Sequence, residues 1–227
     1  TTNYDYDKEQ WAKQMKFASM DCILNPDISP IKYTSIAGLK RGWKRYITMK
    51  KLVERMPDFD NDMLKDVYSK YKSVCNTKNF DDLKLLTRMT THGECARITK
   101  EVNKELNSSF GKQSWKAIKS KKFDTEYEIK IDELDVSSTY LVTLSEDDWL
   151  QITCKTTYQE RLNKDAELTT VTEYPVFEIR LGDTSRGKSN GQFIVVAVMK
   201  KDGTRYGRDG QDASQLRKNF EKSQGWF

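Results

Sequence analysis

The chain has 227 residues and a formal net charge of +5, a length typical of one moderate domain with extensions. The longest apolar run extends from Phe193 to Met199. A membrane-spanning helix needs roughly 20 apolar residues, so we expect no transmembrane segment and only peripheral membrane contact. The mild basic charge permits binding to RNA or an anionic membrane, although an ordinary solvated surface has the same composition. Four scattered cysteines without a CxxC pair predict buried free thiols in a reducing compartment: Cys22, Cys75, Cys95 and Cys154.

A basic amphipathic helix is predicted from Gly38 to Met56, where Pro57 ends it. Its apolar side gathers Leu39, Trp43, Tyr46 and Val53 at 100° per residue. Basic residues dominate the rest of the helix, with Glu54 as its only acid. This imbalance makes six residues candidates for binding phosphates of rRNA or lipid headgroups: Lys40, Arg41, Lys44, Arg45, Lys51 and Arg55. A basic helix that is merely solvated is the alternative.

Aromatic residues outside the predicted core are candidates for docking on a partner. Trp43 and Tyr46 lie on the helix just described, and Trp226 and Phe227 end the chain. We expect the bases of the helix to be dispensable for folding, because they lie off its apolar side.

Three more helices are predicted before the first strand. The first follows several N-cap candidates in residues 58–61 and carries an apolar stripe from Leu64 to Cys75. A shorter helix runs from Phe80 to Met89, and a third covers about residues 94–110. Before the basic helix, a short helix around Trp11 is followed by prolines that favour an extended arm.

The second half of the chain alternates with the period of β-strands. Half-exposed strands are predicted over residues 125–134 and 137–144, and a long strand covers residues 149–158. The next strand, residues 171–181, contains Pro175, which places it at a sheet edge or at a bulge. Residues 193–199 are apolar on both faces, which predicts a central strand.

Alternation also predicts which strand residues face the helices. One face of the long strand carries Leu150, Ile152, Cys154, Thr156 and Tyr158, and the matching face of the next strand carries Phe177, Ile179 and Leu181. We expect the core beneath the helices to include Phe177, Ile179, Ile152 and Val195.

The sequence offers little for catalysis. His92 is the only histidine, so neither a Ser-His triad nor a Cys/His zinc site can be assembled. Glycine-rich phosphate-binding loops of the GxGxxG and GxxxxGK[ST] kinds are missing. We therefore predict a protein that is not an enzyme and needs no metal, cofactor or small-molecule substrate. A small-molecule enzyme that uses Tyr158 or Tyr174 is the alternative.

Short sequence words resemble one known family. Gln151-Ile152-Thr153, the run from Glu173 to Leu181, and Gly191-Gln192-Phe193 are similar in order and spacing to words of a nuclear transport factor 2-like domain. That domain family is shared by the motor-tethering subunit of the mitochondrial presequence translocase and by a large-subunit protein of the mitochondrial ribosome near the tunnel exit. Asn79-Phe80-Asp81-Asp82-Leu83 also resembles the family's break and restart between two helices.

The resemblance implies a fold and a set of functions. The fold is α+β, with helices on a strongly curved antiparallel sheet that forms a cone. Residues 1–57 would be an arm and basic helix, residues 58–200 the cone, and residues 201–227 an extension with a short helix. The expected function is structural, in the large subunit of the mitochondrial ribosome, with rRNA and ribosomal proteins as partners and peripheral contact with the anionic inner membrane from the matrix side. The alternative is a protein import or assembly factor of the same fold, or an assembly subunit of the respiratory chain or ATP synthase.

Overall fold

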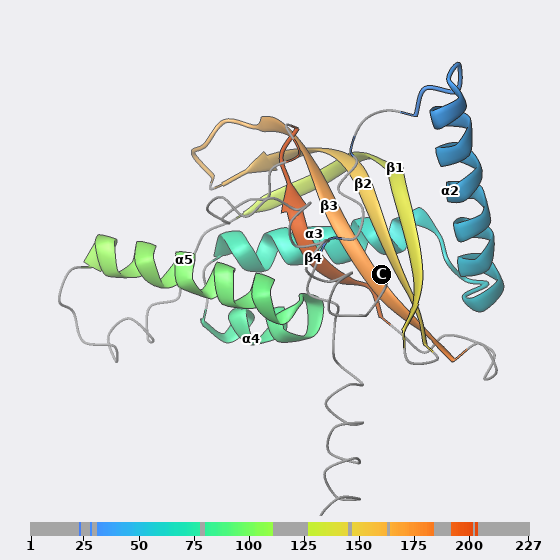
Figure 1. Ribbon diagram of the computed structural model, residues 1–227. Coiled ribbons are helices and arrows are strands. Elements are labelled where there is room, and N and C mark those ends of the chain that lie inside the picture. Colours follow the sequence, from blue (N-terminus) through green and yellow to red (C-terminus); the bar gives the residue numbers. More distant parts are fainter. Residues whose placement is uncertain are drawn as a thin grey trace, which may run out of the picture.

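A computed structural model describes residues 23, 28, 31–77, 80–110, 127–144, 147–162, 164–183, 192–201 and 203. Within them, helices precede a four-stranded antiparallel sheet (Figure 1). The helices are α2 (Ile36–Arg55), α3 (Asn61–Thr77), α4 (Phe80–Met89) and α5 (His92–Phe110). The strands are β1 (Glu128–Leu144), β2 (Asp147–Arg161), β3 (Thr169–Asp183) and β4 (Ile194–Met199). The predicted α+β class is confirmed. The short helix around Trp11, the C-terminal helix, Trp226 and Phe227 lie outside the described residues.

The helices begin where the sequence provides caps. Ser35 caps α2, because its Oγ accepts a hydrogen bond from the Gly38 amide at 3.0 Å. Gly38 itself is required by close packing, since an added Cβ would lie 1.8 Å from the Lys32 carbonyl oxygen. Asp60 caps α3 by accepting from the Met63 amide at 2.9 Å. All four helices predicted over residues 38–110 are thus present, with boundaries close to those expected.

The sheet has the order β1-β2-β3-β4, with every neighbouring pair antiparallel. The two strands predicted over residues 125–144 are instead one long strand, β1. Its pairing with β2 is irregular between Ile131 and Glu133 and again between Val136 and Ser138. Such bulges bend a strand without ending it, so what the sequence presents as a break is a bend.

The prediction that residues 193–199 form a central strand is wrong, because β4 lies at an edge of the sheet. It is nevertheless buried on both faces, and its second edge meets the α4–α5 connection, where the Thr91 amide donates to the Val195 carbonyl at 3.2 Å. The sequence also predicts that Pro175 places its strand at a sheet edge or at a bulge. The edge form is wrong, because β3 is internal, and Pro175 itself pairs with Val198. The pairing of β3 with β4 is irregular just beyond it, between Val176 and Phe177.

The sheet carries a large core on its helix-facing side and a smaller one on its outer side. The four residues predicted beneath the helices, Phe177, Ile179, Ile152 and Val195, are each at most 1% exposed and belong to the large core. The smaller core combines Tyr174, Val176, Val196, Ala197 and Met199 with Ile23 and Ile28. Because Ile23 is only 1% exposed, the N-terminal region takes part in a core at that point.

Candidate docking surface

Helix α2 stands beside the sheet at the free edge of β1, apart from the other three helices (Figure 1). Its C-terminal half joins the large core through Leu52, which is fully buried, with Met49 and Met56 packed beside it. Its N-terminal half meets the strand through polar side chains.

Two arginines attach α2 to the edge of β1. Arg45 Nη1 donates to the Val136 carbonyl at 2.7 Å, and Arg41 Nη2 donates to the Ser137 carbonyl at 3.1 Å. Both carbonyls lie at the bulge of β1, where the register between Val136 and Ser138 shifts. Charged donors make strong hydrogen bonds, and an occupied edge cannot pair with another strand. The arginines therefore both anchor the helix and cover part of an exposed edge.

A third basic residue of α2, Lys44, also contacts β1. Lys44 Nζ lies 4.2 Å from the centroid of the Tyr140 ring on β1, within cation–π distance. The expectation that the bases lie off the packing side of the helix is therefore wrong for Arg41, Lys44 and Arg45. The remaining predicted phosphate-binding bases differ in exposure: Lys40 and Lys51 are exposed, and Arg55 is half-buried.

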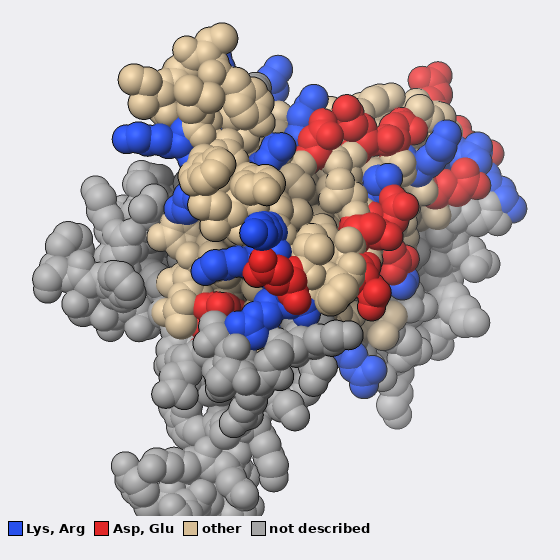
Figure 2. Space-filling view, turned by 90° about the vertical axis from the view of Figure 1, so that its right-hand side faces the viewer, with Lys and Arg blue, Asp and Glu red and all other residues tan. Residues whose placement is uncertain are grey.

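The apolar side of α2 faces solvent. Trp43 is 66% exposed and Tyr46 is 60% exposed, with their ring centroids 5.8 Å apart. The same outward surface continues with further exposed residues: Ile36, Leu39, Ile47 and Val53. We call these six residues, with Trp43 and Tyr46 among them, the outer face of α2. Figure 2, which views the molecule from the side of α2, shows uncharged surface where this helix begins, with basic side chains at its border.

Over its N-terminal half, where polar side chains meet β1, α2 inverts the usual amphipathic helix of a globular domain, which turns its apolar stripe to the core. Exposed contiguous apolar surface bordered by polar residues marks a contact site with a protein or a membrane. Lys40 and Lys51 border the outer face and are exposed. Glu54, the one acid of α2, forms an ion pair with Lys50, with 3.9 Å between Glu54 Oε1 and Lys50 Nζ. The predicted docking residues Trp43 and Tyr46 are thus accessible, and the surface around them is basic.

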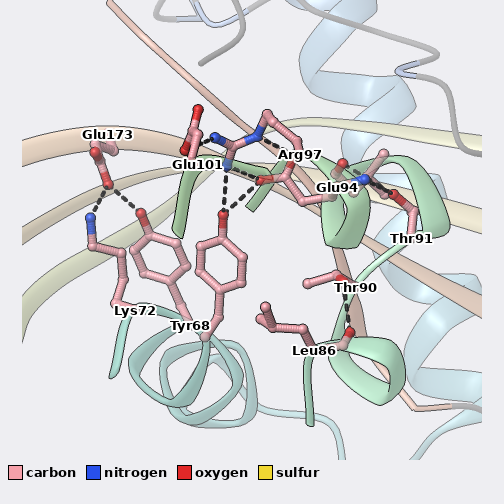
Figure 3. A network of polar contacts seen from close by, with 11 residues as sticks. Tyr68, Lys72, Leu86, Thr90, Thr91, Glu94, Arg97, Glu101 and Glu173 are labelled. Carbon is pink, nitrogen blue, oxygen red and sulfur yellow. Dashed lines mark hydrogen bonds and ion pairs between the residues drawn. The ribbon is translucent and has the colours of Figure 1, made fainter. Parts of the chain in front are cut away.

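A second polar arrangement lies between the helices and the sheet, and sequence reasoning missed it (Figure 3). Glu173 on β3 is 6% exposed, and its Oε2 accepts hydrogen bonds from Tyr68 and, at 2.8 Å, from Tyr158. Lys72 Nζ completes the group at 3.2 Å from the same oxygen. Alternation along β3 contained the signal, because Glu173 shares the helix-facing parity of Val171 and Phe177.

A neighbouring carboxylate joins α3 to α5. Glu94 is fully buried and accepts from Tyr71 at 2.7 Å and from Arg97 at 2.5 Å and 3.0 Å. Arg97 also pairs with Glu101 at 2.8 Å. Burial opposes the charge of Arg97, but its hydrogen bonds and attraction to Glu94 outweigh burial and raise its pKa. Both buried carboxylates therefore have cationic and hydroxyl partners, as buried charges require.

The buried network is closed by aromatic packing. Tyr68 is fully buried, with ring centroids 6.0 Å from Tyr158 and 6.2 Å from Phe177 in edge-on contact. Burial, followed by the charge of Glu173, raises the pKa of Tyr68 and of Tyr158 well above the ordinary value. Both hydroxyls consequently stay protonated and act as donors, so the network holds α3 against β2 and β3.

Two of the described cysteines, Cys75 and Cys154, have thiols poorly suited to chemistry, and Cys22 lies outside the described residues. Burial raises the pKa of Cys75 to about 12 and also raises that of Cys154. A thiol reacts as its thiolate, so neither is activated near neutral pH. Within the described ranges no cluster of three or more His, Cys, Asp or Glu side chains is positioned to hold a metal ion. In the same part of the chain, none of the helices combines the length and the apolar character needed to cross a membrane.

Comparison with known proteins agrees with this architecture. No curated protein sequence matches the chain significantly. A family model for the NTF2-like domain matches residues 8–207, which include all the helices and strands described above. Because the match covers most of the chain, the protein belongs to the NTF2-like domain family.

Proposed function

We propose that this chain is a structural, non-enzymatic subunit of the large subunit of the mitochondrial ribosome, near the tunnel exit, and that it helps hold the particle against the inner membrane from the matrix side. The outer face of α2 carries the proposal. It presents Trp43 and Tyr46 to solvent on a helix whose opposite side is anchored by Arg41 and Arg45.

A helix of this kind suits the surface of an anionic bilayer. Tryptophan and tyrosine favour the level of the headgroups, and apolar neighbours such as Leu39 can enter the boundary of the acyl chains. Each lysine close to an anionic surface contributes about 1 kcal/mol of attraction. Lys40 and Lys51 border the outer face, so the apolar and electrostatic contributions act on the same side of the helix.

The interior of the sheet favours a structural role over catalysis. Tyr68, Tyr158 and Phe177 are each fully buried and fill the space where related cone-shaped sheets can hold a ligand. The carboxylate of Glu173 is occupied by three donors. The short words around Gln151, Glu173 and Gly191 that resemble the translocase and ribosomal proteins support a mitochondrial assembly as the setting.

Vesicle flotation tests the membrane contact. The full chain should float with vesicles that contain an anionic phospholipid and much less with purely zwitterionic vesicles. Trp43→Ser should lower the bound fraction, because it removes an aromatic anchor from the outer face. Leu162→Ser is the matched control, since Leu162 is 54% exposed and lies on β2–β3 connecting chain far along the sequence from α2. Equal binding by the two variants would contradict the assignment of α2.

Co-sedimentation tests the particle. The tagged chain should remain with large mitochondrial ribosomal subunits when the salt concentration is raised. Flotation without ribosome retention would instead support the import or assembly factor of the same fold. If the chain neither floats with vesicles nor remains with the ribosomal subunits, both alternatives are overturned.

A further inference from the structure

A groove on the outer side of the sheet lies next to α2 and has a volume of about 990 Å³. Its floor includes Asp135 on β1, Lys155 on β2, and Thr172 and Tyr174 on β3. Arg45 and Met49 of α2 form one wall, and Lys201, just after β4, lies at the other side. The groove therefore crosses the strands instead of following one of them.

The strand register places the charges of this groove. Asp135 pairs with Lys155 across β1 and β2, and Tyr174 pairs with Met199 across β3 and β4, two residues before Lys201. Lys155 lies opposite Tyr174, and neighbouring strands are about 4.8 Å apart, so Lys155 is about 10 Å from Met199 across the sheet, and Lys201 lies beyond Met199. Arg45 adds a cation at the near edge, and among the described lining residues Asp135 is the one acid. The cations are thus spread along the groove and do not converge on one point.

We propose that this groove binds single-stranded RNA, which would pass across the outer face of the sheet from α2 toward Lys201. A linear polyanion fits cations that are spaced along a groove, whereas one lipid headgroup would need them to converge. Hydroxyls of Ser137, Thr172 and Tyr174 supply the kind of donors that contact phosphate and sugar oxygens. Tyr33, 57% exposed at the rim, offers an aromatic surface on which a base can stack.

An acidic peptide fits the groove less well. Extended peptides usually bind by adding a strand to an open sheet edge, where main-chain groups are unpaired. The groove presents the faces of β1, β2 and β3, whose backbones are already paired with one another. The inference deepens the proposed function, on which it rests for the RNA-rich setting. It also assigns RNA contact to this groove, leaving the outer face of α2 for the membrane.

Fluorescence anisotropy of a labelled single-stranded oligouridylate tests the proposal with the full chain over a range of salt concentrations. The affinity should fall steeply with salt. The double variant Lys155→Ala, Lys201→Ala should flatten the slope of log affinity against log salt by about 1.4, since each lost single-strand contact accounts for about 0.7. Both lysines are exposed, so thermal unfolding should be nearly unchanged.

The matched control is Lys100→Ala, Lys104→Ala on α5, which removes the same charge from exposed positions elsewhere in the described structure. The control should keep the wild-type slope. If the slope changes equally in both double variants, or in neither, the proposal that this groove binds RNA is overturned. Displacement of the RNA by polyglutamate at equal charge concentration would favour an acidic peptide and also overturn the proposal.

Vesicle flotation separates this inference from the proposed function. The groove variant should float with anionic vesicles as the wild type does, because it leaves the outer face of α2 intact. Loss of flotation in that variant would reassign the groove to lipid headgroups. If both proposals are correct, the groove variant should lose RNA binding and ribosome retention and should still float with anionic vesicles.

Discussion

Arg45 Nη1 donates to the carbonyl oxygen of Val136 at 2.7 Å, which joins α2 to the bulge of β1 across a separation of 91 residues in sequence. Arg41 makes the corresponding bond to Ser137. These contacts turn the polar side of α2 to the sheet and leave Trp43 and Tyr46 in solvent. The orientation of the candidate docking surface thus depends on two arginines that the sequence alone suggested for phosphate binding.

Arg45→Ala should lower the free energy of unfolding by about 1.5 to 3 kcal/mol, the usual effect of losing a hydrogen bond to a charged group. Urea denaturation measures this change. Lys40→Ala, an exposed neighbour on the same helix, should stay within about 0.5 kcal/mol of the wild type. Equal stabilities for the two variants would show that the Arg45 contact contributes little in solution.

Phe177→Ala should cost about 3 to 5 kcal/mol, because the ring is fully buried beneath the helices and packs against Tyr68. The midpoint of denaturant unfolding should fall without a large change in its slope. A loss below about 1 kcal/mol would place this side chain on the outer face of the sheet, since a one-residue slip exchanges the two faces.

Glu173→Ala should destabilise the protein by about 3 to 5 kcal/mol, because it leaves the half-buried charge of Lys72 and two buried tyrosine hydroxyls without their partner. The double variant Glu173→Leu, Lys72→Met removes both charges and should recover much of that loss. Thermal and urea unfolding compare the variants. If the double variant is no more stable than Glu173→Ala, the hydroxyls of Tyr68 and Tyr158 dominate the network instead.

Stability should fall at alkaline pH because of the same network. Burial and Glu173 raise the pKa of Tyr68 and Tyr158 in the folded state above the ordinary value of 10.0. Their protonated forms therefore stabilise the fold fully below about pH 10, and this contribution is lost as the pH rises further and the unfolded chain ionises. Each such tyrosine adds about 1.4 kcal/mol of loss per pH unit.

Unfolding temperatures between pH 8 and pH 11 test this expectation. Tyr158→Phe should flatten the alkaline decline, and Tyr33→Phe, whose ring is 57% exposed, is the control. A decline of the same steepness in Tyr158→Phe and the control would exclude Tyr158 as a contributor.

Local sequence patterns determined much of this fold. Helical periodicity located α2 to α5, and alternation placed Ile152, Phe177 and Ile179 on the helix-facing side of the sheet. Capping residues such as Asp60 and the stop at Pro57 set helix boundaries. These features depend on residues a few positions apart, so the sequence contains them directly.

Tertiary structure decided the remaining features, because each depends on what a distant segment places beside a residue. β4 reads as a central strand but lies at an edge, where the α4–α5 connection and cores on both faces bury it. In the sequence, Glu173 is simply a charged residue within a strand. Its contacts with Tyr68, Tyr158 and Lys72 exist only in the folded chain. For α2, the sequence determined that it has an apolar and a basic side. Only the carbonyls at the bulge of β1 decided that its arginines turn inward and its aromatic residues turn to solvent.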